Sequence, residues 1–262
     1  MTASPSDLIL IARENGVTTL SVNRPAALNA LDVPTANAFL AACQSLASDP
    51  ELRVVVLRGE GKGFGAGGDV AALQADPTAT ANELIGSLHE AVLLLTGLDA
   101  PVIASLHGVV AGGSLSLAMA CDLAIAAEST RFNLAYANLG ASCDLSGSWH
   151  LPRLVGLRNA MQIALLSDTF NAAEALRLGL VNRVVPDAQL QDESHALALR
   201  LATGPTRAYG HMKRLLRQSF NRDLPTQLGA EREAFNACTR SADFAEGVDA
   251  FRARRRPVFS GR

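Results

Sequence analysis

The sequence predicts an α/β fold, and three observations point to it. Short apolar runs with the length of buried strands recur at Arg53–Arg58, Pro101–Leu106 and Asp122–Ala127. The first two runs each lead into a glycine-rich turn and then into a stretch with helical periodicity. With 262 residues, 48% of them hydrophobic, the chain is long enough for one well-packed domain. Repeated strand–turn–helix units of this kind are typical of α/β proteins.

The first elements are predicted to be a hairpin followed by a helix. Leu8–Ala12 and Val17–Asn23 have strand character and are separated by a Glu-Asn-Gly turn. Helical periodicity covers Val33–Ser48, with Asp32 as a candidate N-cap and Pro34 in the first turn.

Later elements divide the chain into a core and a helical end. A long helix is predicted over Ala79–Leu98, and a second one from the second glycine turn through Ala120. From about Pro152 onward strand-like runs nearly vanish, and helical stretches continue to about Arg256. We therefore expect a core over residues 1–200 and a helical C-terminal region over residues 201–262 that serves assembly.

Composition excludes several classes of partner. The net charge of −2 and a pI near 6.2 give no basic field for nucleic acid or a membrane surface. The four cysteines show no metal-ligand spacing, and free thiols in a reducing compartment are expected. The first seven residues lack signal-peptide character and no apolar run reaches membrane-spanning length, so we expect a cytoplasmic protein.

Two glycine-rich turns carry the chemistry, at Gly63–Asp69 and at Gly108–Gly113. Glycine lets the main chain approach a ligand closely, and a helix N-terminus behind it adds partial positive charge. Two such turns in one domain suggest a pair of N–H donors that converge on one developing oxyanion. Gly63, Gly65 and Gly68 also fit a dinucleotide-binding pattern, but the turn follows the third strand and lacks the acidic partner.

The chain resembles the crotonase (enoyl-CoA hydratase/isomerase) superfamily. The matching segments are Val22–Leu31 (VNRPAALNAL), the Gly63–Asp69 turn, Pro101–Gly108 (PVIASLHG), Ala111–Gly113, Cys121-Asp122, Leu151–Gly156 (LPRLVG) and Phe251–Phe259 (FRARRRPVF). This resemblance implies a crotonase-like spiral of β-β-α units, an acyl-CoA thioester substrate, and homotrimers or dimers of trimers. Coenzyme A is then part of the substrate, and neither a separate cofactor nor a metal is expected.

The resemblance also implies site residues. It assigns the two oxyanion donors to the backbone N–H groups of Gly68 and Gly113. Other positions would contact the coenzyme A part of the substrate, the last two of them at a subunit boundary: Arg24, Ala66, Gly67, Asp69, Phe235 and Arg254.

The catalytic side chains depart from those of the hydratases in this family. By resemblance, the two water-activating glutamates of the hydratases correspond to Ser116 and Tyr136 here. Neither side chain is a carboxylate base at neutral pH. Hydration in the two-glutamate manner is therefore not expected, although some hydration could survive with water placed by Asp144.

Asp144 falls where isomerases and chlorobenzoyl-CoA dehalogenases of the family place a catalytic aspartate. A single carboxylate can move a proton between two carbons, or it can attack carbon as a nucleophile. Alternatively, Asp144 could cap a helix at Leu145–Leu154. His89 matches the dehalogenase histidine and Tyr136 its active-site tryptophan, but both could instead have purely structural roles in the pocket wall.

Four functions follow from these residues. The first is an enoyl-CoA isomerase with Asp144 as acid and base, and the second is dehalogenase-like hydrolysis with His89 activating water. Residual hydration and a non-catalytic CoA-binding module are the others. The segments Ala71–Ala81 and Leu84–Leu88 are apolar and are expected to line the acyl site.

Overall fold

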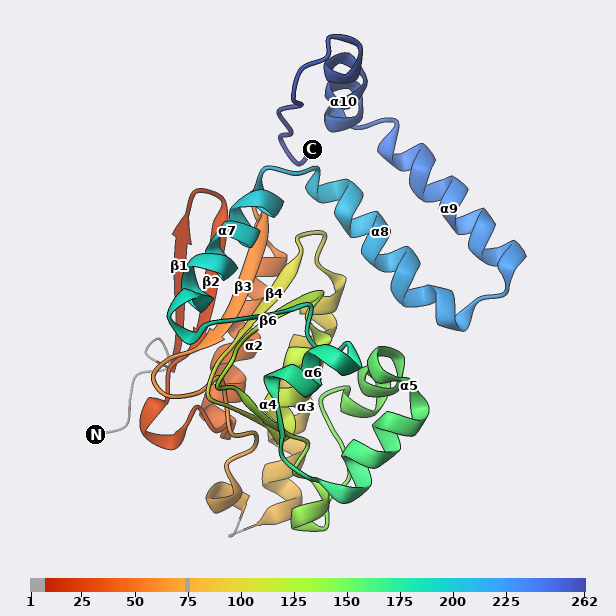
Figure 1. Cartoon of the computed structure of the whole chain (residues 1–262). Helices are drawn as coiled ribbons and strands as arrows, with labels where there is room; N and C mark the ends of the chain where they lie inside the picture. Colours follow the sequence, from red (N-terminus) through yellow and green to blue (C-terminus); the bar gives the residue numbers. More distant parts are fainter. Residues whose placement is uncertain (1–7, 74–75) are drawn as a thin grey trace.

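The computed structural model describes residues 8–73 and 76–262, which are organised around a six-stranded sheet (Figure 1). The strand order is β1-β2-β3-β4-β6-β9, with the β1–β2 hairpin antiparallel and the other neighbours parallel. The predicted hairpin and the three predicted buried strands are confirmed. The strands are β1 (Ile9–Glu14), β2 (Val17–Val22), β3 (Val54–Gly59), β4 (Val102–Leu106), β6 (Leu123–Ala127) and β9 (Arg183–Val185).

A second sheet has three short strands. In it β5 pairs with β7 in parallel and β7 with β8 antiparallel, and the rings of Phe132 and Phe170 stack 5.5 Å apart. The sequence did not predict β5, and the region after Pro152 adds β8 and β9 where helices were expected. Segments of two or three residues are too short to show an alternating pattern. The strands are β5 (Val109–Ala111), β7 (Arg131–Asn133) and β8 (Phe170–Asn171).

Helices cover both faces of the large sheet. Along β3, Val54 and Val56 face the helix α7, whereas Val55 and Leu57 face the main core, so the strand is apolar throughout. The predicted cap of α2 is confirmed, because Asp32 Oδ1 accepts from the Thr35 amide at 2.9 Å. The helices are α2 (Val33–Ala47), α3 (Pro77–Gly97), α4 (Gly112–Ala120), α5 (Gly147–Leu166), α6 (Ala172–Leu178), α7 (Leu190–Ala202), α8 (Thr206–Gln218), α9 (Leu224–Cys238) and α10 (Ala242–Arg252).

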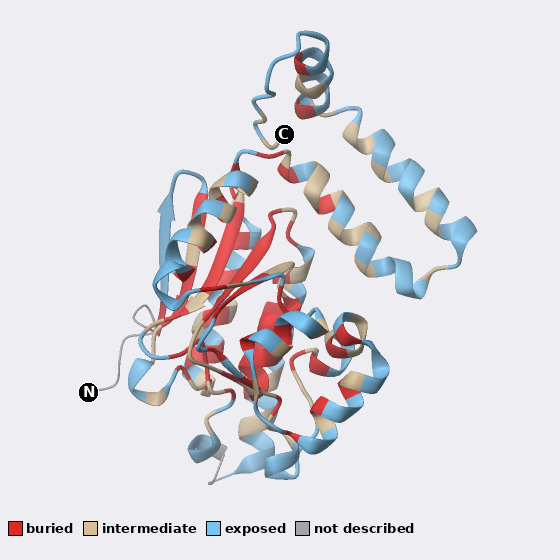
Figure 2. Cartoon of the chain, viewed as in Figure 1, coloured by how far each residue is buried: buried red, intermediate tan, exposed pale blue. Residues whose placement is uncertain are grey.

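Burial is concentrated in the sheet and in α4, as Figure 2 shows. Every residue of α4 is buried, which is why this short helix has no polar face. Among the described residues, no helix combines the length and apolar character needed to cross a membrane. Residues 1–7, which carried the signal-peptide prediction, lie outside the described residues, as do residues 74–75 of the predicted acyl-site segment Ala71–Ala81.

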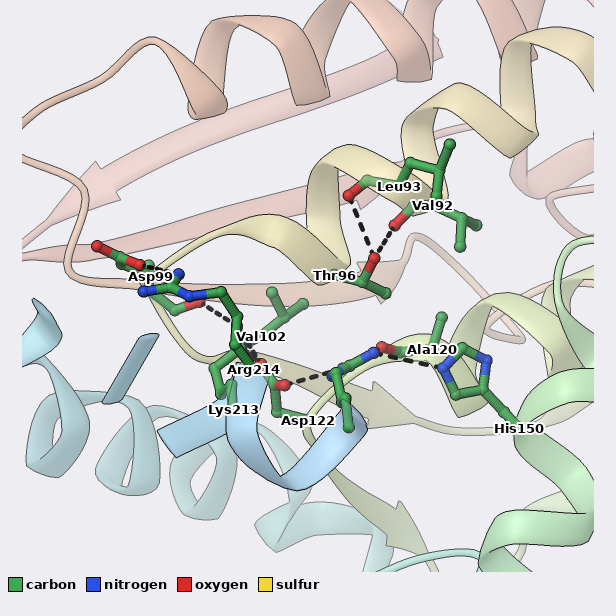
Figure 3. A network of polar contacts seen from close by, with 12 residues as sticks. Val92, Leu93, Thr96, Asp99, Val102, Ala120, Asp122, His150, Lys213 and Arg214 are labelled. Atoms are coloured by element: carbon green, nitrogen blue, oxygen red, sulfur yellow. Dashed lines mark hydrogen bonds and ion pairs between the residues drawn. The ribbon is translucent and has the colours of Figure 1, made fainter. Parts of the chain in front are cut away.

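The helices α8, α9 and α10 extend away from the body of the molecule (Figure 1). A polar network joins α8 to the sheet through Asp122, which follows α4 (Figure 3). The Asp122 carboxylate accepts from Lys213 Nζ at 2.7 Å, from Arg217 at 2.9 Å and from the Val102 amide at 2.8 Å. The predicted boundary between residues 200 and 201 lies in the last turn of α7, just before this region begins.

Candidate active site

The first glycine turn runs between residues 28–31 and β5 and is hydrogen-bonded to both. The Leu31 amide donates to the Gly67 carbonyl at 2.7 Å, and the Asp69 amide donates to the Leu31 carbonyl at 2.9 Å. Between them, the Gly68 amide donates to no other described residue. The sequence suggested a helix behind each turn, but a 3-10 turn (Val70–Leu73) separates Gly68 from α3. The N-terminus of α3 therefore does not directly follow Gly68.

The second glycine turn does open a helix. Gly112 and Gly113 begin α4, and Ala111 provides no side-chain cap, so the Gly113 amide has no acceptor within the described chain. Amides in the first turn of a helix point outward and carry partial positive charge. This is the arrangement that an anionic oxygen requires.

Gly67 brings the two turns into contact. Its φ is +94°, and a Cβ on it would lie 3.0 Å from the Ala111 carbonyl oxygen and 3.2 Å from the Gly113 nitrogen. The Gly67 amide also donates to Ser114 Oγ at 3.1 Å, which ties the turn to α4. Only glycine adopts this backbone without strain, and the residue directly before Gly68 thus lies against the Gly113 nitrogen.

Arg24 is committed to carboxylates within the chain. Its guanidinium lies 3.1 Å from Asp69 and 3.2 Å from Asp32, and it donates to the Ala30 carbonyl at 2.5 Å. Arg24 thus holds Asp69 beside Gly68. Its contact with coenzyme A, and those of Ala66, Gly67 and Asp69, remain predictions.

Asn29 is a positioning residue that our sequence analysis missed. It is 1% exposed with φ +55°, and its side-chain amide donates to the Gly63 carbonyl at 2.7 Å and the Glu60 carbonyl at 2.8 Å. It therefore fixes the start of the first glycine turn. The available signal was the residue type, because asparagine adopts a left-handed backbone more readily than most residues.

Asp144 lies against the second glycine turn. A Cβ on Gly113 would be 3.7 Å from Asp144 Oδ1 and 3.8 Å from the Tyr136 hydroxyl. Tyr136 donates to Asp144 Oδ1, and Ser116 Oγ lies 3.0 Å from the Tyr136 hydroxyl. The structure therefore gathers these predicted residues around the Gly113 amide.

Burial sets the protonation of this group. It raises the pKa of the Asp144 carboxyl above its usual range, against the opposing effects of the Tyr136 hydrogen bond and nearby His89. Burial and the neighbouring carboxylate also raise the pKa of the Tyr136 phenol, so it keeps its hydrogen at neutral pH. A carboxylate with a raised pKa is a stronger base.

The alternative role of Asp144 as a helix cap is wrong. The helix α5 begins at Gly147 with Ser146 as its N-cap, and the Asp144 side chain faces Tyr136 instead. Leu145 has φ +46° and Ser146 has φ +65°, so two consecutive left-handed residues turn the chain between Asp144 and the helix. The helix is also longer than predicted, with a break at Gly156.

His89 of α3 reaches the same corner. Its Nε2 accepts from the Leu145 amide at 3.3 Å, which leaves the ring hydrogen of the neutral form on Nδ1. His89 is exposed and lies next to the Asp144 segment. The structure thus places His89 beside the Asp144 segment, and its catalytic role stays a prediction.

Phe235 and Arg254 do not join this group within one chain. Phe235 belongs to α9 and Arg254 follows α10, both in the part that extends from the body (Figure 1). The Phe235 ring packs edge-on against Phe244, 6.0 Å away. Within residues 8–73 and 76–262, no three His, Cys, Asp or Glu side chains gather as metal ligands would.

The fold and the site define an acyl-CoA enzyme of the crotonase type. A solved enoyl-CoA hydratase from Bacillus anthracis superimposes with a TM-score of 0.93 at 28% identity, covering 97% of this chain and 100% of that one. The shared architecture extends through the C-terminal helices. The predicted α/β fold with crotonase-like topology is therefore confirmed.

The chain belongs to the enoyl-CoA hydratase/isomerase family, whose profile matches residues 12–262. The 1,2-epoxyphenylacetyl-CoA isomerase of Escherichia coli is 39% identical, over 98% of this chain and 99% of that protein. The crotonyl-CoA hydratase of Syntrophomonas wolfei is 34% identical, over 96% of this chain and 97% of that protein. The chain is thus an enzyme of this family.

Proposed function

We propose that this chain isomerises an enoyl-CoA thioester by moving the double bond between the β,γ and α,β positions. Asp144 removes the proton from the α-carbon and returns it at the γ-carbon. The observation that carries the proposal is the Asp144 carboxylate beside the open Gly113 amide, with serine and tyrosine at the positions of the hydratase glutamates.

The two glycine amides supply the electrostatic part of the reaction. Removing the α-proton places negative charge on the thioester oxygen, where the Gly68 and Gly113 N–H groups would donate to it. Fixed donors need no reorganisation as the charge develops, and losing one typically costs about 3 kcal/mol of barrier. The double-bond shift involves no net oxidation, and the proton taken from one carbon is restored to the other.

A candidate acyl group comes from the name of a relative. The name of the Escherichia coli relative makes a phenylacetyl-CoA ring epoxide a candidate substrate beside linear enoyl-CoAs.

We also propose that the protein assembles as a homotrimer or a dimer of trimers. In that assembly, Phe235 and Arg254 would reach the coenzyme A bound to a neighbouring subunit.

A substrate panel tests this function. The purified protein is assayed against β,γ-enoyl-CoAs, 1,2-epoxyphenylacetyl-CoA, crotonyl-CoA and 4-chlorobenzoyl-CoA. We expect an isomerised product, and we expect Asp144→Asn to lower kcat/KM by about 10²–10⁴ while still binding butyryl-CoA. Asp192→Asn, on the exposed side of α7, is the matched control. Parental activity in Asp144→Asn would refute the proposal, and CoA binding without any turnover would indicate a non-catalytic module.

A second candidate is aspartyl attack followed by hydrolysis. The position of His89 beside the Asp144 segment favours it, because a histidine there could activate water. In that case, His89→Gln would accumulate an acyl-enzyme, detected as a mass increment on Asp144. Isomerisation forms no such adduct, so intact-protein mass spectrometry separates the two mechanisms. Water addition to crotonyl-CoA would reveal residual hydration.

A further inference from the structure

Ser116 and Tyr136 occupy the two positions assigned to the hydratase glutamates, and they contact each other as well as Asp144. We propose that Tyr136, oriented by Ser116, is a positioning residue that holds Asp144 Oδ1 and leaves Oδ2 to carry the proton. This inference rests on the proposed isomerase function and assigns the proton to one oxygen of its base.

The direction of the hydrogen bonds follows from counting hydrogens. The Tyr136 phenol has one hydrogen and two oxygen neighbours, Asp144 Oδ1 and Ser116 Oγ. An ionised carboxylate can only accept, so the phenol hydrogen goes to Asp144. Ser116 then donates to the Tyr136 oxygen. The Ser116 side chain has 0% exposure on α4, so its hydroxyl does not turn toward bulk water.

The two oxygens of Asp144 consequently differ. Oδ1 accepts the phenol hydrogen, whereas no side chain of the described residues donates a hydrogen bond to Oδ2. During the double-bond shift, the α C–H bond breaks and an O–H bond forms at Oδ2. That O–H bond then breaks as a C–H bond forms at the γ-carbon. Because the phenol holds Oδ1 in place, Oδ2 presents the same lone pair to the α-carbon and to the γ-carbon.

The phenol also stabilises the ionised form of the base. A hydrogen bond to a carboxylate favours the anion, and it opposes the burial that acts in the other direction. The other titratable groups near this carboxylate are His89 on α3 and Cys143 in the same loop. Neither donates a hydrogen bond to the carboxylate, so the phenol is its one side-chain partner within the described residues, beside the Asp144 backbone amide.

Gly147 provides an independent way to disturb the hydrogen bonds that join Ser116, Tyr136 and Asp144. A Cβ at this first residue of α5 would lie 2.5 Å from Ser116 Oγ, and its backbone does not require glycine. Gly147→Ala therefore displaces Ser116 without removing any hydroxyl group. If Ser116 orients the phenol, this variant and Ser116→Ala should act in the same direction.

The test is the pH dependence of Tyr136→Phe, which keeps the ring and loses the hydroxyl. We expect the acidic limb of kcat/KM to move up by about one pH unit, with smaller upward shifts in Ser116→Ala and Gly147→Ala. Carboxyl ¹³C NMR with labelled aspartate follows the same group without turnover, and Asp144→Asn identifies its resonance. Affinity for butyryl-CoA should be unchanged.

The outcomes separate this inference from the function it rests on. If the pH profile of Tyr136→Phe matches the parental profile in an enzyme that needs Asp144, the positioning role of Tyr136 is refuted. The isomerase function is not affected by that result. An NMR titration unchanged by Tyr136→Phe refutes the positioning role independently. If Asp144→Asn isomerises at the parental rate, both the proposed function and the positioning role of Tyr136 are refuted, whatever the NMR titration shows.

Discussion

At the scale of single residues, the site depends on positions where backbone and side chain have one permitted arrangement. Gly67 must be glycine because of its φ of +94° and its contact with Ala111 and Gly113. Asn29 and Ser114 then hold the turn through hydrogen bonds to its backbone. The Gly68 amide is thus positioned by neighbours that need not touch the substrate.

Gly67→Ala tests this positioning. A side chain in the left-handed region costs about 1–3 kcal/mol, and relief of the clash would separate Gly68 from Gly113. We expect lower stability in chemical denaturation and a drop in kcat of about tenfold or more. Gly86→Ala is the control, because its Cβ would meet nothing within 4 Å on α3. It should gain about 0.5–1 kcal/mol, and equal behaviour of the two variants would contradict the account.

Asp144 is expected to cost stability at neutral pH. Its folded pKa is raised, so its contribution to stability is present below the ordinary aspartate pKa and lost as pH rises through the raised one. Asp144→Asn removes the buried charge and should raise Tm at pH 7, with the gain shrinking toward pH 4. Asp192→Asn should not raise Tm, because that exposed carboxylate lies in the first turn of α7, where a negative charge favours the helix. A lower Tm for Asp144→Asn at pH 7 would contradict this assignment.

At the scale of elements, the Asp122 network decides how α8 is held. Asp122 is 13% exposed and pairs with Lys213 and Arg217, both from α8 (Figure 3). Burial lowers the pKa of the Lys213 ammonium, although the carboxylate opposes this. The two ion pairs are favourable only while Lys213 and Arg217 both keep the Asp122 carboxylate as their partner.

Asp122→Asn should therefore loosen α8 from the sheet. Leaving buried cations without their carboxylate costs about 3 kcal/mol, and hydrogen exchange should rise first in α8. Glu174→Gln breaks an exposed ion pair with Arg177 on α6 and should cost at most about 1 kcal/mol. A similar small effect in both variants would show that the network does not hold the helix.

The sequence predicted elements with strong periodicity and missed the shortest ones. The run Val54–Leu57 is apolar because both faces of β3 are buried, and Asp32 signals its helix through a local hydrogen bond. In contrast, β5 has three residues and no pattern of its own. The contact between Tyr136 and Asp144 depends on the left-handed turn at Leu145. Leucine does not favour that backbone conformation, so the residue type did not predict the turn.

At the scale of the whole molecule, the C-terminal helices expose an apolar surface. Phe251 is 86% exposed, and with Phe244 and Val248 it lines a groove of about 460 Å³ along α10. Exposed apolar surface of this kind is typical of an interaction site. Under the proposed assembly, a second copy of the chain covers it.

Phe251→Asp tests whether this surface holds the assembly. A charge placed in an apolar interface disfavours association, so we expect the parental protein to sediment as a trimer or hexamer and the variant as a smaller species. Circular dichroism should show retained helix content. A parental protein that sediments as a monomer, or a variant with unchanged mass, would contradict the proposed interface.

In the proposed mechanism, one carboxylate transfers a proton between two carbons of a thioester beside two glycine amides. The most direct measurement uses a β,γ-enoyl-CoA that carries deuterium at the α-carbon, with NMR following the label. Because Asp144 returns the proton that it removes, we predict that the parental enzyme transfers deuterium to the γ-carbon of the product, and that Asp144→Asn transfers none although it still binds the thioester. Transfer at the parental rate by Asp144→Asn would contradict the account.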